Sequence, residues 1–125
     1  MNPPPAPTTA RLEQEPIIWL ASVRPTGRPH LVPLWFVWAG GRIYLCVAGT
    51  SVKARNLAVN PAVALALESG SSPIVVEGQA TILTPPWPAE VVQGFQRKYD
   101  WEITTDTAYD TLVAVTPQRW LMTPQ

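Results

Sequence analysis

The stretch IIWLASVRPTGRPHLVPLWFVWAGGRIYLCVA, residues 17–48, decides the fold class of this chain. Its apolar and β-branched runs are interrupted twice, at Pro25-Thr26-Gly27-Arg28 and at Gly40-Gly41. Proline presets one turn angle and glycine tolerates a positive φ, so both interruptions predict tight turns. The stretch therefore predicts three consecutive antiparallel strands, Ile17 to Arg24, His30 to Trp38 and Arg42 to Ala48.

The rest of the chain adds short elements of both kinds. Two short helices are expected, at Ser51 to Asn60 and at Pro86 to Tyr99. Further strands are expected at Ala62 to Glu68, at Ile74 to Leu83 and at Thr111 to Val115, the last continuing at Trp120 to Met122 beyond Pro117. Six or seven strands with short helices and no long repeat favour a mainly β fold, a small antiparallel barrel.

The composition indicates one compact domain in a neutral chain. The 125 residues are 46% hydrophobic and 14% charged, and a chain of this length can bury a core without disulfides. Nine basic and nine acidic residues balance, which excludes the long-range positive field that non-specific nucleic-acid binding needs. A single cysteine and a single histidine exclude a disulfide framework and a structural zinc site.

The sequence offers no membrane anchor. No apolar run approaches the roughly 20 residues that span a bilayer, and residues 1–9 lack a basic start followed by an apolar block. We therefore expect a cytoplasmic protein without membrane contact. Residues 1–9 hold four of the 15 prolines, so we expect residues 1–10 to form a flexible arm before a domain at 11–125.

Strand His30 to Trp38 is apolar on both of its expected faces. One face would carry Leu34, Phe36 and Trp38, and the other would carry Leu31, Trp35 and Val37. A strand with a second apolar face needs cover from a ligand or from another subunit. We therefore expect an obligate homodimer.

The segment Gly49-Thr-Ser-Val-Lys-Ala-Arg-Asn-Leu57 is the strongest candidate for a binding site. It combines two hydroxyls, the free amides of a helix start and two cations within one and a half turns, which suits a phosphate or a carboxylate. The alternative is an exposed, capped helix with solvated cations. Lys53 and Arg55 are two residues apart and cannot share one helix face, so one of them reaches across the site or the helix begins after Lys53.

Other residues carry weaker indications. His30 has no carboxylate or cysteine partner at a recognisable spacing, which favours an ordinary hydrogen-bonded histidine over one that contacts substrate. Cys46 is expected to be a small buried hydrophobic residue. No paired carboxylates support hydrolysis, so we expect neither a catalytic side chain nor a metal site. The tryptophans that could wall a substrate pocket or lie in the core are Trp35, Trp38, Trp87, Trp101 and Trp120.

Several blocks follow one another in a recognisable order. They are GRPHLVPLWF (27–36), GRIY (41–44), SVKARNL (51–57), NPAV (60–63), VEGQA (76–80) and LTPP (83–86). Together they resemble the flavin-binding split β-barrels related to pyridoxamine 5′-phosphate oxidase. The most specific block is KARNL followed by NP. KARN and the TPP ending are similar to the branch that includes deazaflavin (coenzyme F-420) dependent reductases.

This resemblance implies a six-stranded antiparallel split β-barrel that forms a homodimer, with two cofactors bound in grooves between the subunits. The cofactor phosphate would lie on the helix-start motif, at Thr50, Ser51, Lys53, Arg55 and Asn56. The strand segment Val32, Pro33, Leu34 and Trp35 would lie along the isoalloxazine ring. Pro33 agrees with that role, because a residue without an N–H suits a strand edge that faces a ligand.

The activity implied by the resemblance is that of an F-420- or FMN-dependent oxidoreductase, which passes a hydride between the cofactor and a small unsaturated substrate. The alternative is a non-catalytic flavin or haem binding or storage protein of the same fold. Arg24, Arg28 and Arg42 lie in a stretch without acids, residues 16–67. They would favour the deazaflavin through its anionic tail if they line one groove, and are otherwise solvated.

Overall fold

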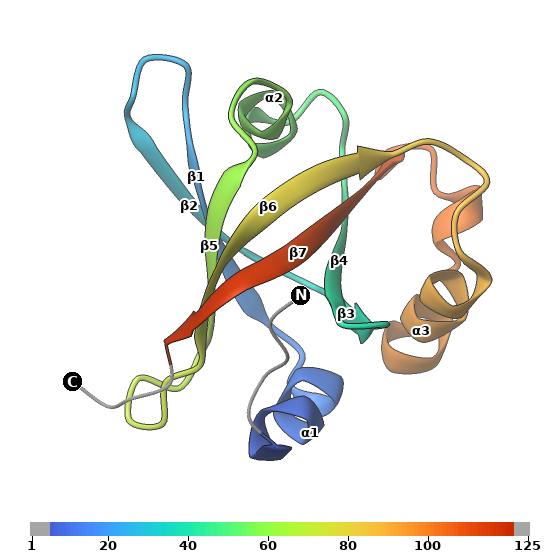
Figure 1. Cartoon of the computed structure of the whole chain (residues 1–125). Coiled ribbons are helices and arrows are strands. Elements are labelled where there is room, and N and C mark those ends of the chain that lie inside the picture. Colours follow the sequence, from blue (N-terminus) through green and yellow to red (C-terminus); the bar gives the residue numbers. More distant parts are fainter. Residues whose placement is uncertain (1–5, 122–125) are drawn as a thin grey trace.

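The computed structural model describes residues 6–121 of the chain. These residues form three helices, a short 3-10 turn and seven strands (Figure 1). The helices are α1 (Ala6–Gln14), α2 (Val52–Val59) and α3 (Ala89–Tyr99), with the 3-10 turn η1 at Ile103–Thr105. The strands are β1 (Ile18–Val23), β2 (Pro29–Leu34), β3 (Val37–Ala39), β4 (Arg42–Val47), β5 (Ala62–Leu67), β6 (Val75–Leu83) and β7 (Thr111–Leu121).

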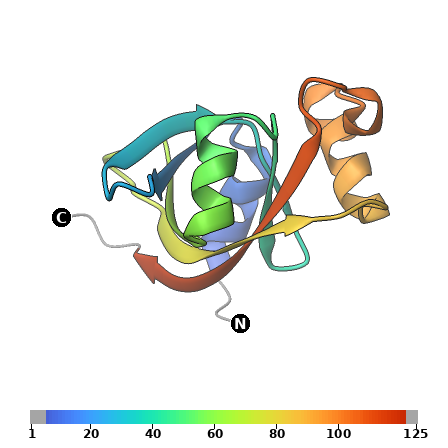
Figure 2. The ribbon, with the colours of Figure 1, turned by 90° about the horizontal axis from the view of Figure 1, so that it is seen from above.

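The seven strands form one antiparallel sheet in the order β2-β1-β5-β6-β7-β4-β3. The sheet curls into a half-barrel, with α2 beside one open end and α1 near the other (Figures 1 and 2). The mainly β antiparallel fold is thus confirmed. The count of six strands is corrected to seven, because the run expected as one strand at His30 to Trp38 is two strands, β2 and β3.

The break between β2 and β3 explains why the sheet curls. These two strands lie at opposite edges of the sheet, yet only Trp35 and Phe36 separate them. Three peptide steps span at most about 11 Å, so the two edges must approach each other. The backbone of Phe36 is satisfied by α3 instead of by a strand: its N–H donates to the Tyr99 hydroxyl at 3.0 Å and its carbonyl accepts from Lys98 Nζ at 3.1 Å.

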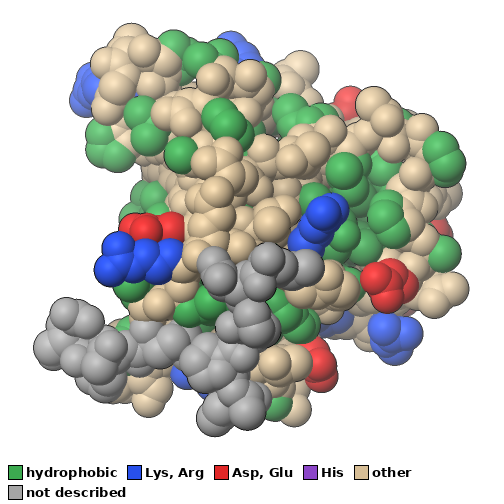
Figure 3. Space-filling model, in the orientation of Figure 1, with side chains coloured by type: hydrophobic (Ala, Val, Ile, Leu, Met, Phe, Trp, Pro, Cys, Tyr) green, Lys and Arg blue, Asp and Glu red, His purple; other side chains and the backbone are tan. Residues whose placement is uncertain are grey.

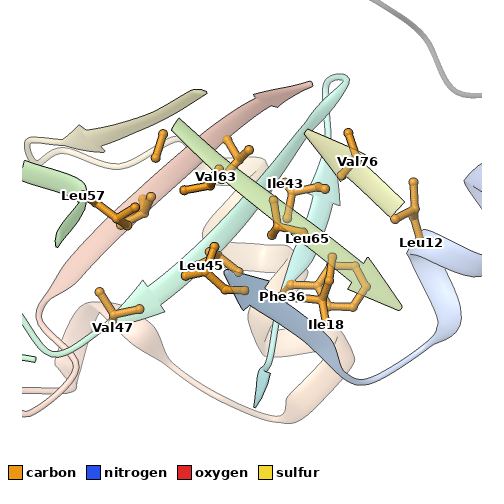
Figure 4. Packing of buried hydrophobic residues seen from close by; sticks show 14 of the residues in the cluster. Leu12, Ile18, Phe36, Ile43, Leu45, Val47, Leu57, Val63, Leu65 and Val76 are labelled. Atoms are coloured by element: carbon orange, nitrogen blue, oxygen red, sulfur yellow. The ribbon is translucent and has the colours of Figure 1, made fainter. Parts of the chain in front are cut away.

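The interior of the half-barrel holds the main hydrophobic core. Figure 4 shows side chains from β1, β4, β5, β6, α1 and α2 pointing toward one another there, together with Phe36. Leu12 of α1 is fully buried in this core. That contact corrects the expected arm at residues 1–10, because residues 6–10 belong to helix α1. The rest of that expectation falls on residues 1–5, outside the described part.

A second core lies between α3 and the outer face of β3 and β4. Ile43, Leu45 and Val47 of β4 face the main core, whereas Tyr44 and Cys46 pack under α3 and η1. Val37 of β3 also lies there, so close to α3 that a Cβ on Gly94 would stand 2.8 Å from Val37 Cγ1. At Val37, α3 therefore covers the second apolar face of the predicted strand. Our expectation that this face needs a ligand or another subunit is wrong at this residue.

Strand β7 runs without a break through Pro117, where we expected an interruption. Its pairing with β6 shifts register by one residue, since Glu77 pairs with Arg119 but Gly78 pairs with Pro117. A bulge tolerates a residue that has no N–H to donate. No helix within residues 6–121 is long and apolar enough to cross a membrane.

Candidate functional site

The start of helix α2 presents unpaired backbone donors. Ser51 caps the helix: its Oγ accepts from the Ala54 N–H at 3.2 Å and donates to the Ala48 carbonyl at 2.6 Å. The N–H groups of Val52 and Lys53, in the first turn, have no acceptor within the helix. Thr50 next to them is exposed. This geometry and the positive end of the helix dipole favour an anion.

The two basic side chains of the motif, Lys53 and Arg55, lie in different surroundings. The helix begins at Val52, before Lys53, so the two side chains lie on different helix faces. Lys53 is half-buried, whereas Arg55 is exposed. Burial, followed by the positive charges of Arg24 and Lys53, lowers the pKa of His30. Lys53 and Arg24 therefore both act on the side chain of His30, between the β1–β2 hairpin and α2.

Asn56, the last residue of the predicted phosphate motif, is buried under the helix. Its Nδ2 donates to the Ser22 Oγ of β1 at 3.1 Å. Ser22 pairs with His30 across the β1–β2 ladder. The structure thus connects α2, β1 and β2 at one end of the half-barrel. His30 Nδ1 is buried there and has no hydrogen-bond partner within the described residues.

The predicted ring-binding segment is the end of an edge strand. β2 pairs only with β1 in the sheet, and its side chains alternate between half-buried and exposed. Val32 and Leu34 face inward, whereas Pro33 is exposed. Trp35 follows the strand, is 46% exposed and stacks on Tyr99 with ring centroids 4.6 Å apart.

A cleft of about 450 Å³ opens beside this segment. The structure brings Pro33, Leu34 and Trp35 together there with three residues that sequence reasoning did not assign to the site as a group. These are Trp101, Asp106 and Tyr109, from the segment between α3 and β7. Of these three, the sequence indicates only Trp101 as a candidate pocket wall, because no local spacing connects residues 101–109 with β2. Ile17 and Cys46 complete the lining.

The three arginines of the acid-free stretch do not line one groove. Arg24 and Arg28 flank the β1–β2 turn, where Arg24 Nη1 donates to the Pro29 carbonyl at 2.7 Å. Arg42 begins β4, whereas α2 follows the other end of that strand, about 17 Å away at the usual strand rise. Figure 3 shows Lys and Arg side chains on the upper part of the molecule, where the β1–β2 hairpin and α2 lie. Arg42 cannot share that surface.

An acidic residue that sequence reasoning missed lies next to the helix start. Asp110 Oδ1 accepts from the Gly49 N–H at 2.8 Å and from the Thr111 hydroxyl at 3.1 Å. The bond from Gly49, followed by that from Thr111, lowers the pKa of Asp110, so the carboxylate is ionised at neutral pH. Its negative charge opposes an anion at α2. Within residues 6–121 no three His, Cys, Asp or Glu side chains gather to hold a metal ion.

The sequence model of the family described as pyridoxamine 5′-phosphate oxidase matches residues 7–123 of this chain. The chain belongs to the pyridoxamine 5′-phosphate oxidase family. Among solved structures, an F420 reductase is 27% identical, with a TM-score of 0.77 over 94% of this chain and 98% of its own. No curated protein matches the chain in sequence.

Two further members of this fold differ more in sequence. HutZ, the haem storage protein from Vibrio cholerae, is 18% identical, covers 93% of this chain and 92% of its own, and has a TM-score of 0.79. The conserved hypothetical protein Rv2991 from Mycobacterium tuberculosis is 24% identical over 94% of this chain and 82% of its own, with a TM-score of 0.74. At these identities the likeness concerns the fold alone.

Proteins of the pyridoxamine 5′-phosphate oxidase family typically bind a flavin, and the described residues fit such a group. A phosphate needs donors and positive charge, which the first turn of α2 and Lys53 supply. A flat ring system needs an apolar wall at an open strand edge, which Pro33 and Trp35 supply. His30 Nδ1, on the same strand as Pro33, is buried and has no hydrogen-bond partner within the described residues.

Proposed function

We propose that this protein is an oxidoreductase that binds a flavin-type cofactor, the deazaflavin F-420 or FMN, and reduces a small unsaturated substrate. The observation that carries the proposal is that the Asn56–Ser22 bond holds the anion-binding start of α2 against β1, beside His30 of the open edge strand β2, and that this edge leads from His30 to Pro33 and Trp35. The likeness to an F420 reductase over nearly the whole of both chains supports it.

The residues of the chain would bind and orient the cofactor. Thr50, Lys53 and the first-turn N–H groups that the Ser51 cap leaves free would hold its phosphate, with Arg55 adding positive charge from the exposed face of the helix. The backbone of residues 32–35 lies along its ring. The bound cofactor supplies the hydride chemistry, so the protein needs no nucleophile of its own. Pro33 and Trp35 would give the ring an apolar wall.

We further propose that the protein works as a cytoplasmic homodimer. Leu31, on the outer face of the edge strand β2, is 62% exposed, and β2 has a sheet neighbour on one side only, β1. A second copy of the chain placed against this face would bury Leu31 and complete the cofactor groove. Sedimentation of the purified chain at micromolar concentration should give twice the mass of 13.7 kDa. A folded monomer would contradict this part of the proposal.

Titration of the purified chain with deazaflavin, FMN and haem tests the cofactor. We expect one of the two flavin-type cofactors to bind with micromolar affinity or better, and Lys53→Gln to weaken it about tenfold. The reduced cofactor should then be reoxidised by an unsaturated substrate only in the presence of the protein. Binding of haem alone, or of none of the three, would refute the oxidoreductase and favour a storage or purely structural role.

A further inference from the structure

The cleft beside β2 has the form of an aromatic box. Trp101 stands at 74° to the Trp35 ring and at 83° to the Tyr109 ring, with centroids 5.8 and 5.6 Å away. Trp35 in turn is held by its stack on Tyr99 at 4.6 Å. Trp35 and Tyr109 are both 46% exposed, so their rings are partly open to a ligand. These rings come from two distant parts of the chain.

The box is electrostatically negative. Asp106 Oδ2 accepts from the Trp101 Nε1–H at 3.0 Å, and Oδ1 accepts from the backbone of Ala108 and Tyr109 at 2.9 and 2.8 Å. These bonds, the one from Tyr109 first, lower the pKa of Asp106, which keeps the carboxylate ionised. A carboxylate on the indole N–H also makes the ring face of Trp101 richer in electrons.

A second carboxylate acts on the same cleft. The pKa of the Cys46 thiol in the cleft wall is raised to about 12, first by burial and then by the negative charges of Asp106 and Asp110. None of the eight residues that line the cleft carries a positive charge. An anionic ligand would therefore be repelled, and a cation would be attracted both by the carboxylates and by the ring faces.

We propose that this cleft binds a small organic cation with a flat apolar body, such as an N-alkylated aromatic ring. The volume of about 450 Å³ lies in the range of ligand pockets and accommodates a one- or two-ring molecule. Trp35, Trp101 and Tyr109 contact its faces, and Asp106 compensates its charge. This binding does not depend on the cofactor. Pro33 and Trp35 line both this cleft and the wall assigned to the cofactor ring, so a bound cation would lie next to the ring. The further step, that this cation is the substrate, rests on the proposed function.

Isothermal titration of the cofactor-free protein with three ring compounds of similar shape tests the charge preference. The probes are N-methylquinolinium, neutral quinoline at pH 7.5 and 1-naphthoate. We expect N-methylquinolinium to bind at least about threefold more tightly than quinoline and at least about tenfold more tightly than 1-naphthoate. In proton–nitrogen NMR spectra, the indole N–H signals of Trp35 and Trp101 should shift, whereas that of Trp120 should not. Tightest binding of 1-naphthoate, or no shift at Trp101, would overturn the proposal.

Two variants test the assigned residues. Asp106→Asn removes the charge but keeps an oxygen for the two backbone donors, and Tyr109→Leu removes one exposed ring. Each should weaken N-methylquinolinium binding about three- to tenfold. Glu102→Gln, which removes an exposed carboxylate of the same segment outside the cleft wall, is the matched control and should leave binding unchanged. Equal effects of Asp106→Asn and Glu102→Gln would show that only the general charge of the segment matters.

A competition experiment separates this proposal from the proposed function. Lumiflavin, a flavin ring without a phosphate, should not displace N-methylquinolinium. Displacement would assign the cleft to the cofactor ring and overturn the proposal. If neither deazaflavin nor FMN binds while N-methylquinolinium still does, the oxidoreductase is refuted and the cation site stands.

Discussion

Asn56 Nδ2 donates a hydrogen bond to Ser22 Oγ at 3.1 Å, and both residues are 2% exposed. This bond joins helix α2 to strand β1 at the end of the half-barrel that carries the candidate cofactor site. It fixes the start of α2 relative to the β1–β2 hairpin, so that Lys53 and Arg24 both act on His30. Asn56 thus holds the predicted phosphate motif in place through its buried contact with β1.

Removal of this bond should destabilise the protein. Asn56→Ala leaves the Ser22 hydroxyl buried without its partner, which costs about 1–3 kcal/mol in the free energy of unfolding. Urea unfolding measures this value. The double variant Asn56→Ala with Ser22→Ala should cost less than the sum of the single variants, since both partners are then absent. Strict additivity would show that the two side chains do not interact.

The sequence predicted the elements whose signals are local. The alternation of Ile43, Leu45 and Val47 indicates a strand without knowledge of its neighbours, and Ser51 lies where a helix cap is expected. The two-residue turn at Gly40-Gly41 also follows from local chemistry, and both glycines have positive φ. The family resemblance rests on the same local blocks, and the match over residues 7–123 confirms it.

The features that the sequence did not predict depend on contacts between distant segments. Phe36 is apolar like its neighbours, and its separation from β2 depends on two distant residues. The Tyr99 hydroxyl, 63 residues away, accepts a hydrogen bond from the Phe36 N–H, and Lys98 donates one to the Phe36 carbonyl. The prolines before Leu12 predict a flexible arm, although the chain from Ala6 to Gln14 is helix α1. The approach of Asp110 to Gly49 likewise depends on the pairing of β4 with β7. The spacing of residues in the sequence does not predict contacts of this kind.

The contact between Gly94 and Val37 should be intolerant of one added methyl group. In Gly94→Ala the new Cβ would lie 2.8 Å from Val37 Cγ1, so α3 must move or Val37 must turn. We expect a loss of about 1–3 kcal/mol in the free energy of unfolding, typical of an overpacked core. Val37→Ala in the same chain should recover part of this loss by making room. If the double variant loses more free energy of unfolding than Gly94→Ala alone, the strain does not come from the contact with Val37.

Cys46 should make the folded protein sensitive to alkali. Its thiol has a pKa of about 12 in the folded chain, raised by burial above the ordinary 9.0. Above pH 9 the unfolded chain therefore releases a proton that the folded chain keeps, so stability falls as pH rises from 9 toward 12. Cys46→Ser retains a donor toward the Tyr109 carbonyl without titrating in this range, and its stability should fall less steeply. Identical pH profiles from urea unfolding would exclude this role.

The two cations of α2 should contribute unequally to cofactor binding. Lys53 is half-buried and lies close enough to act on His30, whereas Arg55 is exposed on another face of the helix. Lys53→Gln should weaken FMN or deazaflavin binding about tenfold, and Arg55→Gln less than about threefold. Fluorescence titration at low salt measures both. A larger effect of Arg55→Gln would mean that the phosphate lies on the exposed face of α2.

The carboxylate of Asp110 should weaken phosphate binding at the start of α2. It accepts from the Gly49 N–H, two residues before the helix cap Ser51, and its lowered pKa keeps it negative. Asp110→Asn keeps an oxygen for Gly49 while removing the charge. It should tighten FMN binding about two- to fivefold at low salt, and the gain should shrink at 1 M salt, where the screening length is about 3 Å. Glu68→Gln removes a carboxylate far from α2, just beyond the end of β5, and should leave the affinity unchanged. If Asp110→Asn instead weakens FMN binding, the main role of Asp110 is to hold Gly49 in place, and its repulsion of the phosphate is the smaller effect.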